Sequence, residues 1–318
     1  MTHPFRVWVC VVGGCLALVS QGGSADFRSS NVEYLGLPDG QGFTPAVDIV
    51  VVVDNSGSMG LEILSLEDEL YDHLVGPLIT GGADARVIVV SRHGDNAGES
   101  ICFEAPLSSV PAGGCASPPA QPGITDIFKH YSVEVGSHDA WCLLMSTFDG
   151  TTSDEFGLAP GGWIEWAREG ALKVVLMVTD DGVTCGVYDD DDSVALGTAA
   201  ATAIDSDLLA LSAPHFGTMS NRSYVVHSLV GLMENTIPNV PWPPTAPVTA
   251  SSCGTAVSAG TGHQAMSVLT KGMRFPICLT TEYDTFLNHV ALDTANRLPI
   301  FSDGFESGST TEWSMVMP

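Results

Sequence analysis

One segment, VDIVVVV at residues 47–53, constrains the fold more than any other part of this sequence. A run of β-branched residues that is apolar at nearly every position cannot leave one strand face in water. Such a run is typical of a strand covered on both faces. Segments 85–91 (ARVIVVS) and 172–180 (LKVVLMVTD) repeat the pattern. We therefore expect a central sheet that is buried on both sides.

Segments with helical periodicity alternate with the strands. In segment 62–78, apolar residues recur at Ile63, Leu66, Leu70 and Leu74, which places them on one helical stripe. Alternating strands and helices indicate βαβ units. The sequence thus predicts an α/β fold: a doubly wound, mainly parallel central sheet with helices on both faces, in three Rossmann-like layers. Further strands are expected at 131–135, 223–232 and 274–279, and further helices at 138–148, 193–211, 263–273 and 282–292.

The first 25 residues have the pattern of a secretory signal peptide. Arg6 precedes an apolar run from Val7 to Val19, and small residues follow up to Ala25. That run is shorter than the roughly 20 residues that span a bilayer, so we expect no membrane span in the mature chain. A lipoprotein modified at Cys15 is an alternative. The expected location is secreted, periplasmic or at the cell surface.

After the signal peptide we expect three regions. Residues 26–44 form an N-terminal lead-in, residues 45–297 form the α/β domain with loop insertions, and residues 298–318 form a C-terminal tail. The insertions near 93–124, 149–162 and 236–262 are read as surface loops, because the strand and helix alternation resumes after each.

Six cysteines follow the signal segment, and an even number in an exported chain favours disulfides. None belongs to a C-x-x-C pair, so a zinc site is not indicated. By proximity in the sequence, we predict the pairs Cys102–Cys115, Cys142–Cys185 and Cys253–Cys278.

The charge balance narrows the partners. The chain has 37 acidic residues against 11 Lys and Arg, for a formal net charge of −26. Nucleic acids and anionic membrane surfaces both require a basic face. We therefore expect neither as a partner.

The first strand ends in DNSGSMG, residues 54–60. A parallel strand delivers its carboxyl end to the crevice where open α/β sheets bind ligands, so the carboxylate of Asp54 is expected there. Tight turns on glycine backbone bring the hydroxyls of Ser56 and Ser58 to the same side. One carboxylate and two hydroxyls form a hard, oxygen-only set that suits Mg²⁺, Mn²⁺ or Ca²⁺. The alternative is a plain turn and helix cap, because Asp, Asn and Ser favour both.

This motif resembles the D-x-S-x-S signature of von Willebrand factor type A (vWA) domains, their metal-ion-dependent adhesion site. The resemblance extends through the strand and helix order from about Ala46 to Arg297. In that family a first loop supplies Asp, Ser and Ser, a second supplies Thr and a third supplies Asp. The resemblance therefore implies Asp54, Ser56 and Ser58 from the first loop, and Asp180 from the third.

The second loop departs from the family, because no GGT-x-T segment is present. The sequence GSHDAWCLL follows the strand at 131–135, so Ser137 is the candidate for the missing hydroxyl. Asp139 is read as the N-cap of the next helix. The hydroxyls of Thr147, Thr151 and Thr152 remain alternatives.

The resemblance implies an interaction role. We expect Mg²⁺ as the cofactor, with Mn²⁺ and Ca²⁺ as alternatives, and a protein ligand that offers a carboxylate to it. The function expected is adhesion or protein binding and not catalysis; a structural role in surface or envelope assembly is the alternative. A secreted hydrolase is less supported, because no G-x-S-x-G elbow is present and Ser56 has no evident His partner.

Overall fold

The computed structural model describes residues 8–11, 14–17, 44–94 and 99–298, in two compact units, residues 1–40 and 41–318. In the first unit, β1 (Trp8–Val11) and β2 (Gly14–Ala17) form an antiparallel hairpin. The rest of the predicted signal peptide, the lead-in up to residue 43 and the tail from residue 299 lie outside the described residues. The boundaries proposed for these segments stay predictions.

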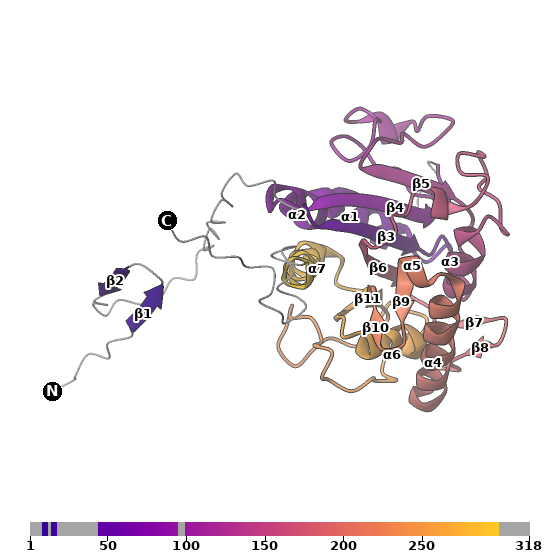
Figure 1. Cartoon of the computed structure of the whole chain (residues 1–318). Helices are drawn as coiled ribbons and strands as arrows, with labels where there is room; N and C mark the ends of the chain where they lie inside the picture. Colours follow the sequence, from indigo (N-terminus) through magenta and orange to yellow (C-terminus); the bar gives the residue numbers. More distant parts are fainter. Residues whose placement is uncertain (1–7, 12–13, 18–43, 95–98, 299–318) are drawn as a thin grey trace. The chain divides into compact units, whose positions relative to one another are not determined.

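The second unit is built on a six-stranded sheet in which every described pairing is parallel (Figure 1). The strand order is β12-β11-β6-β3-β4-β5. The strands are β3 (Ala46–Val53), β4 (Asp84–Ser91), β5 (Phe128–Ser132), β6 (Leu172–Thr179), β11 (Tyr224–Val230) and β12 (Arg274–Pro276).

Helices cover both faces of this sheet. One face carries α1 (Gly60–Leu70), the π-helical turn η1 (Tyr71–Val75), α2 (Gly76–Thr80) and α7 (Tyr283–Arg297). The other carries α3 (Ala140–Phe148), α4 (Val194–Leu211), α5 (Ala213–Phe216) and α6 (Thr261–Thr270). The remaining short elements are η2 (Gly114–Ala116), η3 (Trp163–Glu165), β7 (Thr184–Cys185), β8 (Tyr188–Asp189), β9 (Gly217–Thr218), β10 (Asn221–Arg222) and η4 (Thr280–Glu282).

Strand β3 shows why the sheet is covered by helices on both faces. Ile49 and Val51 pack into the core beneath α1 and α7, whereas Val50 and Val52 pack into the core beneath α3, α4 and α6. All four side chains are fully buried, as successive strand residues pointing to opposite covered faces must be. The predicted three-layer, doubly wound α/β fold is confirmed.

Asp48 is the one acid within this strand, and it is fully buried. Its carboxylate accepts a hydrogen bond from Arg168 Nε at 2.8 Å and lies 3.4 Å from Lys173 Nζ. A buried charge is tolerated when it is paired in this way. The pairing explains how a charged residue can stand in a doubly covered strand.

The path of the chain creates a topological switch point between β3 and β6. From β3 the chain moves outward to β4 and β5, then returns to β6 on the other side of β3 and continues to β11 and β12. The direction of winding therefore reverses between β3 and β6. Open α/β sheets bind ligands at the carboxyl ends of the strands at such a topological switch point.

All three predicted disulfides are present. The Cα atoms are 5.6 Å apart in Cys102–Cys115 and 6.2 Å apart in both Cys142–Cys185 and Cys253–Cys278. Disulfides form and persist in oxidising compartments. The three bonds therefore indicate an exported protein.

Helix α4 bears on the expectation of no membrane span. By length and composition it is apolar enough to cross a membrane. In the structure, however, one of its faces is buried in the core, including Ala200, Ala201, Ile204 and Leu208. Core helices of soluble proteins meet the same criterion.

A buried arginine holds the proline-rich segment between β11 and α6. Arg274 is fully buried, and its guanidinium donates hydrogen bonds to the backbone carbonyls of Pro243, Ala246 and Pro247 at 2.8–3.0 Å. Burial lowers the pKa of Arg274 to about 10. The segment is thus fastened to the sheet edge through its main chain.

Candidate metal centre

The candidate site lies at the switch point, where β3 and β6 end side by side. In their parallel register, Val53 is opposite Val178. The backbone N–H of Asp54 donates to the carbonyl of Val178 at 3.0 Å, and Asp180 follows two residues after Val178. Neighbouring strands are about 4.8 Å apart, so side chains just beyond their ends meet. The sheet itself therefore brings Asp54 and Asp180 together.

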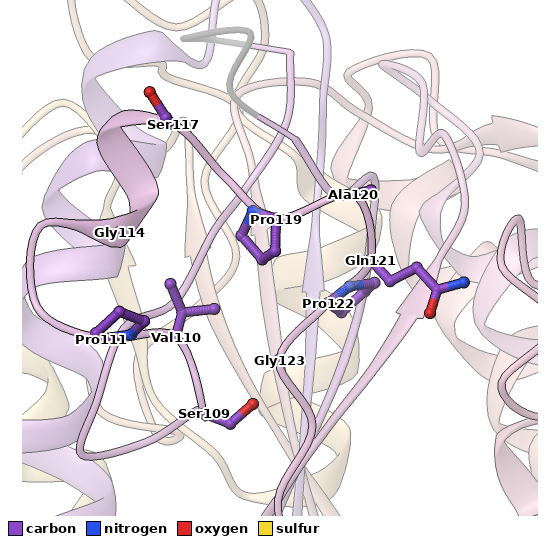
Figure 2. A pocket seen from close by; sticks show the side chains of 10 residues that line it. All are labelled: Ser109, Val110, Pro111, Gly114, Ser117, Pro119, Ala120, Gln121, Pro122 and Gly123. Atoms are coloured by element: carbon purple, nitrogen blue, oxygen red, sulfur yellow. The ribbon is translucent and has the colours of Figure 1, made fainter.

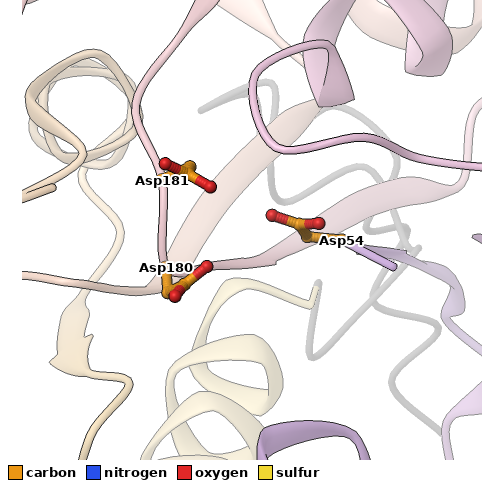
Figure 3. A group of neighbouring side chains, drawn as sticks. All are labelled: Asp54, Asp180 and Asp181. Carbon is orange, nitrogen blue, oxygen red and sulfur yellow. The ribbon is translucent and has the colours of Figure 1, made fainter. Parts of the chain in front are cut away.

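Three carboxylates converge there (Figure 3). Asp54, Asp180 and Asp181 each offer one oxygen, and these oxygens all lie within 4.8 Å of one another. The three residues are only 0%, 2% and 2% exposed. Figure 3 shows the carboxylates turned toward a common space. We call these three residues the acid cluster.

The first loop binds back onto the cluster through both predicted serines. Asp54 accepts a hydrogen bond from the backbone N–H of Ser56 at 2.7 Å. The hydroxyls of Ser56 and Ser58 are 3.2 Å apart, and Ser58 donates to Asp180 Oδ1 at 3.1 Å. The structure thus brings together the four residues expected from the first and third loops.

The second loop also reaches the cluster. Its backbone is tied to the first loop, because the N–H of Asn55 donates to the carbonyl of Val135 at 2.8 Å. The hydroxyl of Ser137 interacts with the carboxylate of Asp181, and His138 Nδ1 lies 3.9 Å from Asp181 Oδ1. Ser137 is therefore beside the cluster through Asp181.

The alternatives to Ser137 are engaged elsewhere. The buried hydroxyl of Thr147 donates to the carbonyl of Leu143 at 2.6 Å within α3. The hydroxyl of Thr152 is 2.8 Å from that of Ser146. The backbone N–H of Thr151 donates to Asp149 Oδ1 at 3.0 Å, and its hydroxyl bonds to the same carboxylate. These three threonines stabilise α3 and the turn after it.

Asp139 does stand at the N-cap position of α3, as expected, but its side chain makes no cap hydrogen bond to the helix. Its carboxylate instead accepts from the backbone N–H of Gly136 at 2.8 Å. It therefore orders the second loop, on which Ser137 stands.

Burial and mutual repulsion define the electrostatics. Burial raises the pKa of Asp180 to about 6, and the nearby charges of Asp181 and Asp54 act in the same direction. Burial also raises the pKa of Asp181, although the Ser137 hydroxyl and His138 partly oppose this. Carboxylates that share a site disfavour one another's charged forms, and a cation removes that penalty.

The third loop is braced from behind. The carbonyl of Asp180 accepts hydrogen bonds from the N–H groups of Val257 and Ser258, both at 3.0 Å. A Cβ at Gly182 would lie 2.6 Å from Oδ1 of the buried Asp190, so a larger residue would have to displace that carboxylate. The backbone that carries the two acids is therefore fixed.

The sequence patterns did not identify two residues that contribute to the site. Thr179 donates its hydroxyl to Asp54 Oδ2 at 2.7 Å, and Asp181 completes the cluster. The sequence VTDDG contains both. The signal was their position at the end of a buried strand, beside Asp180.

The residues present fit a divalent cation. The donors are carboxylate and hydroxyl oxygens, the ligands that hard cations prefer. Asp181 Oδ1 is buried and has no hydrogen-bond partner, and buried carboxylate oxygens are normally paired. A cation among the three acids satisfies that atom and neutralises most of their charge. Mg²⁺, Mn²⁺ and Ca²⁺ all accept such oxygen donors.

A separate pocket of about 670 Å³ lies in the loop between β4 and β5 (Figure 2). Its ten lining residues, from Ser109 to Gly123, are proline, glycine, serine, alanine, valine and glutamine. None of them carries a charge. We assign it no chemistry.

Fold and site together define a disulfide-bonded, doubly wound α/β protein with an acid cluster at its topological switch point. No protein-family model, curated protein or solved structure matches the chain.

Proposed function

We propose that this chain is an exported docking domain of the vWA kind. It binds a divalent cation through Asp54, Ser56, Ser58 and Asp180, and it holds a carboxylate of a protein partner on that cation. The hydrogen bond from Ser58 to Asp180, which joins the two strand ends, is the observation that carries the proposal. Ser137 remains our candidate for the second-loop hydroxyl, because it lies against Asp181.

The accessibility of the site supports docking. The acids are buried, but Ser58 and Gly57 are exposed and Ser56 is partly exposed. A cation held here is surrounded by protein on the acidic side and faces solvent on the serine side. In a partly dry site, the attraction between a cation and an incoming carboxylate is stronger than in water.

The same contacts favour docking over catalysis. The Ser58 hydroxyl bonds to Asp180 and to the Ser56 hydroxyl. A nucleophilic serine requires a base that accepts its proton, usually a histidine that a third group orients. We therefore propose a binding role for both serines.

Metal titration tests the cation step. Calorimetry with Mg²⁺ or Mn²⁺ should show saturable binding to the wild-type protein and none to Asp54→Ala. Asp126→Ala, which removes an exposed acid, is the matched control and should bind as the wild type does. Equal heats for the wild type and Asp54→Ala would refute the site.

Affinity capture tests the partner step. The immobilised protein, incubated with native extract, should retain partners in Mg²⁺ and release them in EDTA. The Asp54→Ala variant should retain none of these partners. Retention that survives EDTA would favour the alternative, assembly through another face.

A further inference from the structure

Asp181 carries the one carboxylate oxygen of the acid cluster that is buried and has no hydrogen-bond partner. Both oxygens of Asp54 accept hydrogen bonds, from Ser56 N and from the Thr179 hydroxyl, and Asp180 accepts one from Ser58. Asp181 Oδ1 accepts none, although the residue is only 2% exposed. A buried carboxylate oxygen without a donor is unfavourable unless a cation is its partner.

The surroundings hold Asp181 against the cluster. Its backbone N–H donates to the Thr179 hydroxyl at 3.1 Å, and the preceding carbonyl is bound by two N–H groups. The Ser137 hydroxyl bonds to the same carboxylate. His138 Nδ1 lies 3.9 Å from Asp181 Oδ1, which is too distant for a hydrogen bond. The carboxylate lies within 4.8 Å of its two acidic neighbours.

We propose that Asp181 is itself a ligand of the cation and that it must leave the cation before a partner's carboxylate can bind there. Asp181 is thus an internal competitor of the partner. This inference rests on the proposed function, because it concerns the same cation and the same partner carboxylate.

Charge explains the consequence. Two carboxylates neutralise a dication, and a third leaves the occupied site with a net charge of −1. A partner's carboxylate meets repulsion unless Asp181 leaves the cation. Small free carboxylates therefore bind poorly, and a partner needs further contacts with the surrounding loops to displace Asp181.

Mn²⁺ provides the test, because both its affinity and the number of exchanging waters on it are measurable. Calorimetry and water-proton relaxation are compared for the wild type, Asp181→Asn and Asp191→Asn. The last variant removes an exposed acid from a nearby loop and is the matched charge control. Asp181→Asn should bind Mn²⁺ about tenfold more weakly and gain an exchanging water, because a neutral amide is a poorer ligand for a hard cation than a carboxylate. Added acetate should displace water from Mn²⁺ in Asp181→Asn but not in the wild type or in Asp191→Asn.

The outcomes separate this inference from the proposed function. If wild type and Asp181→Asn show equal affinity and equal hydration, the internal competitor is overturned while the cation site stands. Weaker binding at unchanged hydration also overturns it, because charge alone explains such a result. No Mn²⁺ binding by the wild type overturns both. Should Asp181→Asn fail to fold, as judged by circular dichroism, Asp181→Ser undergoes the same measurements.

Discussion

The hydroxyl of Ser58 donates a hydrogen bond to Asp180 at 3.1 Å, although 122 residues separate them in the chain. The two residues meet because they follow neighbouring parallel strands, β3 and β6, in the middle of the sheet. The sheet therefore determines the geometry of the site, and the loops add donors to it.

Removal of the Ser58 hydroxyl should weaken the cation site without unfolding the protein. Ser58 is exposed, so Ser58→Ala creates no core cavity, but it deletes one donor and one bond to Asp180. We expect the Mg²⁺ dissociation constant to rise by about tenfold, equivalent to about 1.4 kcal/mol. Titration calorimetry measures this. Ser65→Ala, which deletes a hydroxyl bonded within α1, should leave the constant unchanged.

Cation binding should stabilise the fold. A ligand that binds only the folded state adds about 2.7 kcal/mol at a hundred times its dissociation constant. For a domain of this size, such a gain raises Tm by roughly 5–10 °C. Differential scanning calorimetry with Mg²⁺ and with EDTA checks this for wild type and Asp54→Ala. A Tm that rises equally in both proteins would place the stabilising ion elsewhere.

Acid should destabilise the protein through buried His227. Burial lowers the pKa of His227 to about 4, partly opposed by Asp293, while Arg297 lowers it further. Between pH 6.5 and 4 the unfolded chain therefore binds more protons at this residue than the folded chain. The free energy of unfolding that His227 contributes is fully present above pH 6.5. It is lost as pH falls toward 4, by on the order of 3 kcal/mol.

Urea unfolding at several pH values measures this loss. His227→Asn should show a shallower dependence on pH in that window, whatever its overall stability. His289→Asn, which changes an exposed histidine in α7, is the control and should follow the wild type. Identical slopes for His227→Asn and the wild type would contradict the prediction.

The disulfide Cys142–Cys185 should matter for the site as well as for stability. It ties α3, which follows the second loop, to β7, which follows the third. Replacing both cysteines by serine should lower the unfolding free energy by about 4 kcal/mol on the chain-entropy estimate for its 43-residue separation. Mg²⁺ affinity should fall too, because Ser137 and Asp181 are then held less firmly.

The matched comparison is the double serine variant of Cys102 and Cys115, which are 13 residues apart. Its expected loss is about 3 kcal/mol. Mg²⁺ affinity should be unchanged, because that bond closes a loop beyond β4. Calorimetry and urea unfolding of the two variants decide whether only the first bond supports the site.

The periodicity of the sequence was enough to predict the layers but not every local turn. Residues 62–78 were expected to form one α-helix, and the structure places a π-helical turn at Tyr71–Val75 within it. There the N–H of Gly76 donates to the carbonyl of Tyr71, one residue further than in an α-helix. Pro77 has no N–H and disturbs the preceding turn. The spacing of apolar residues does not predict this change from an α-helical to a π-helical turn.

For the site, strand ends were predictable and loop orientations were not. Asp54 and Asp180 follow apolar runs, and their meeting follows from strand order. The position of Ser137 depends on the conformation of a loop held by Asn55 and Asp139, which no spacing encodes. The inward orientation of Asp181 likewise depends on backbone bonds made by Thr179 and by residues 257 and 258.

The hydrogen bonds from Arg274 to the proline-rich segment have an evolutionary consequence. Its guanidinium recognises carbonyl groups, which every amino acid possesses. Side chains along that segment can therefore diversify without loosening their anchorage. The surface of this segment can thus vary in sequence while the buried arginine beneath it keeps the same three hydrogen bonds.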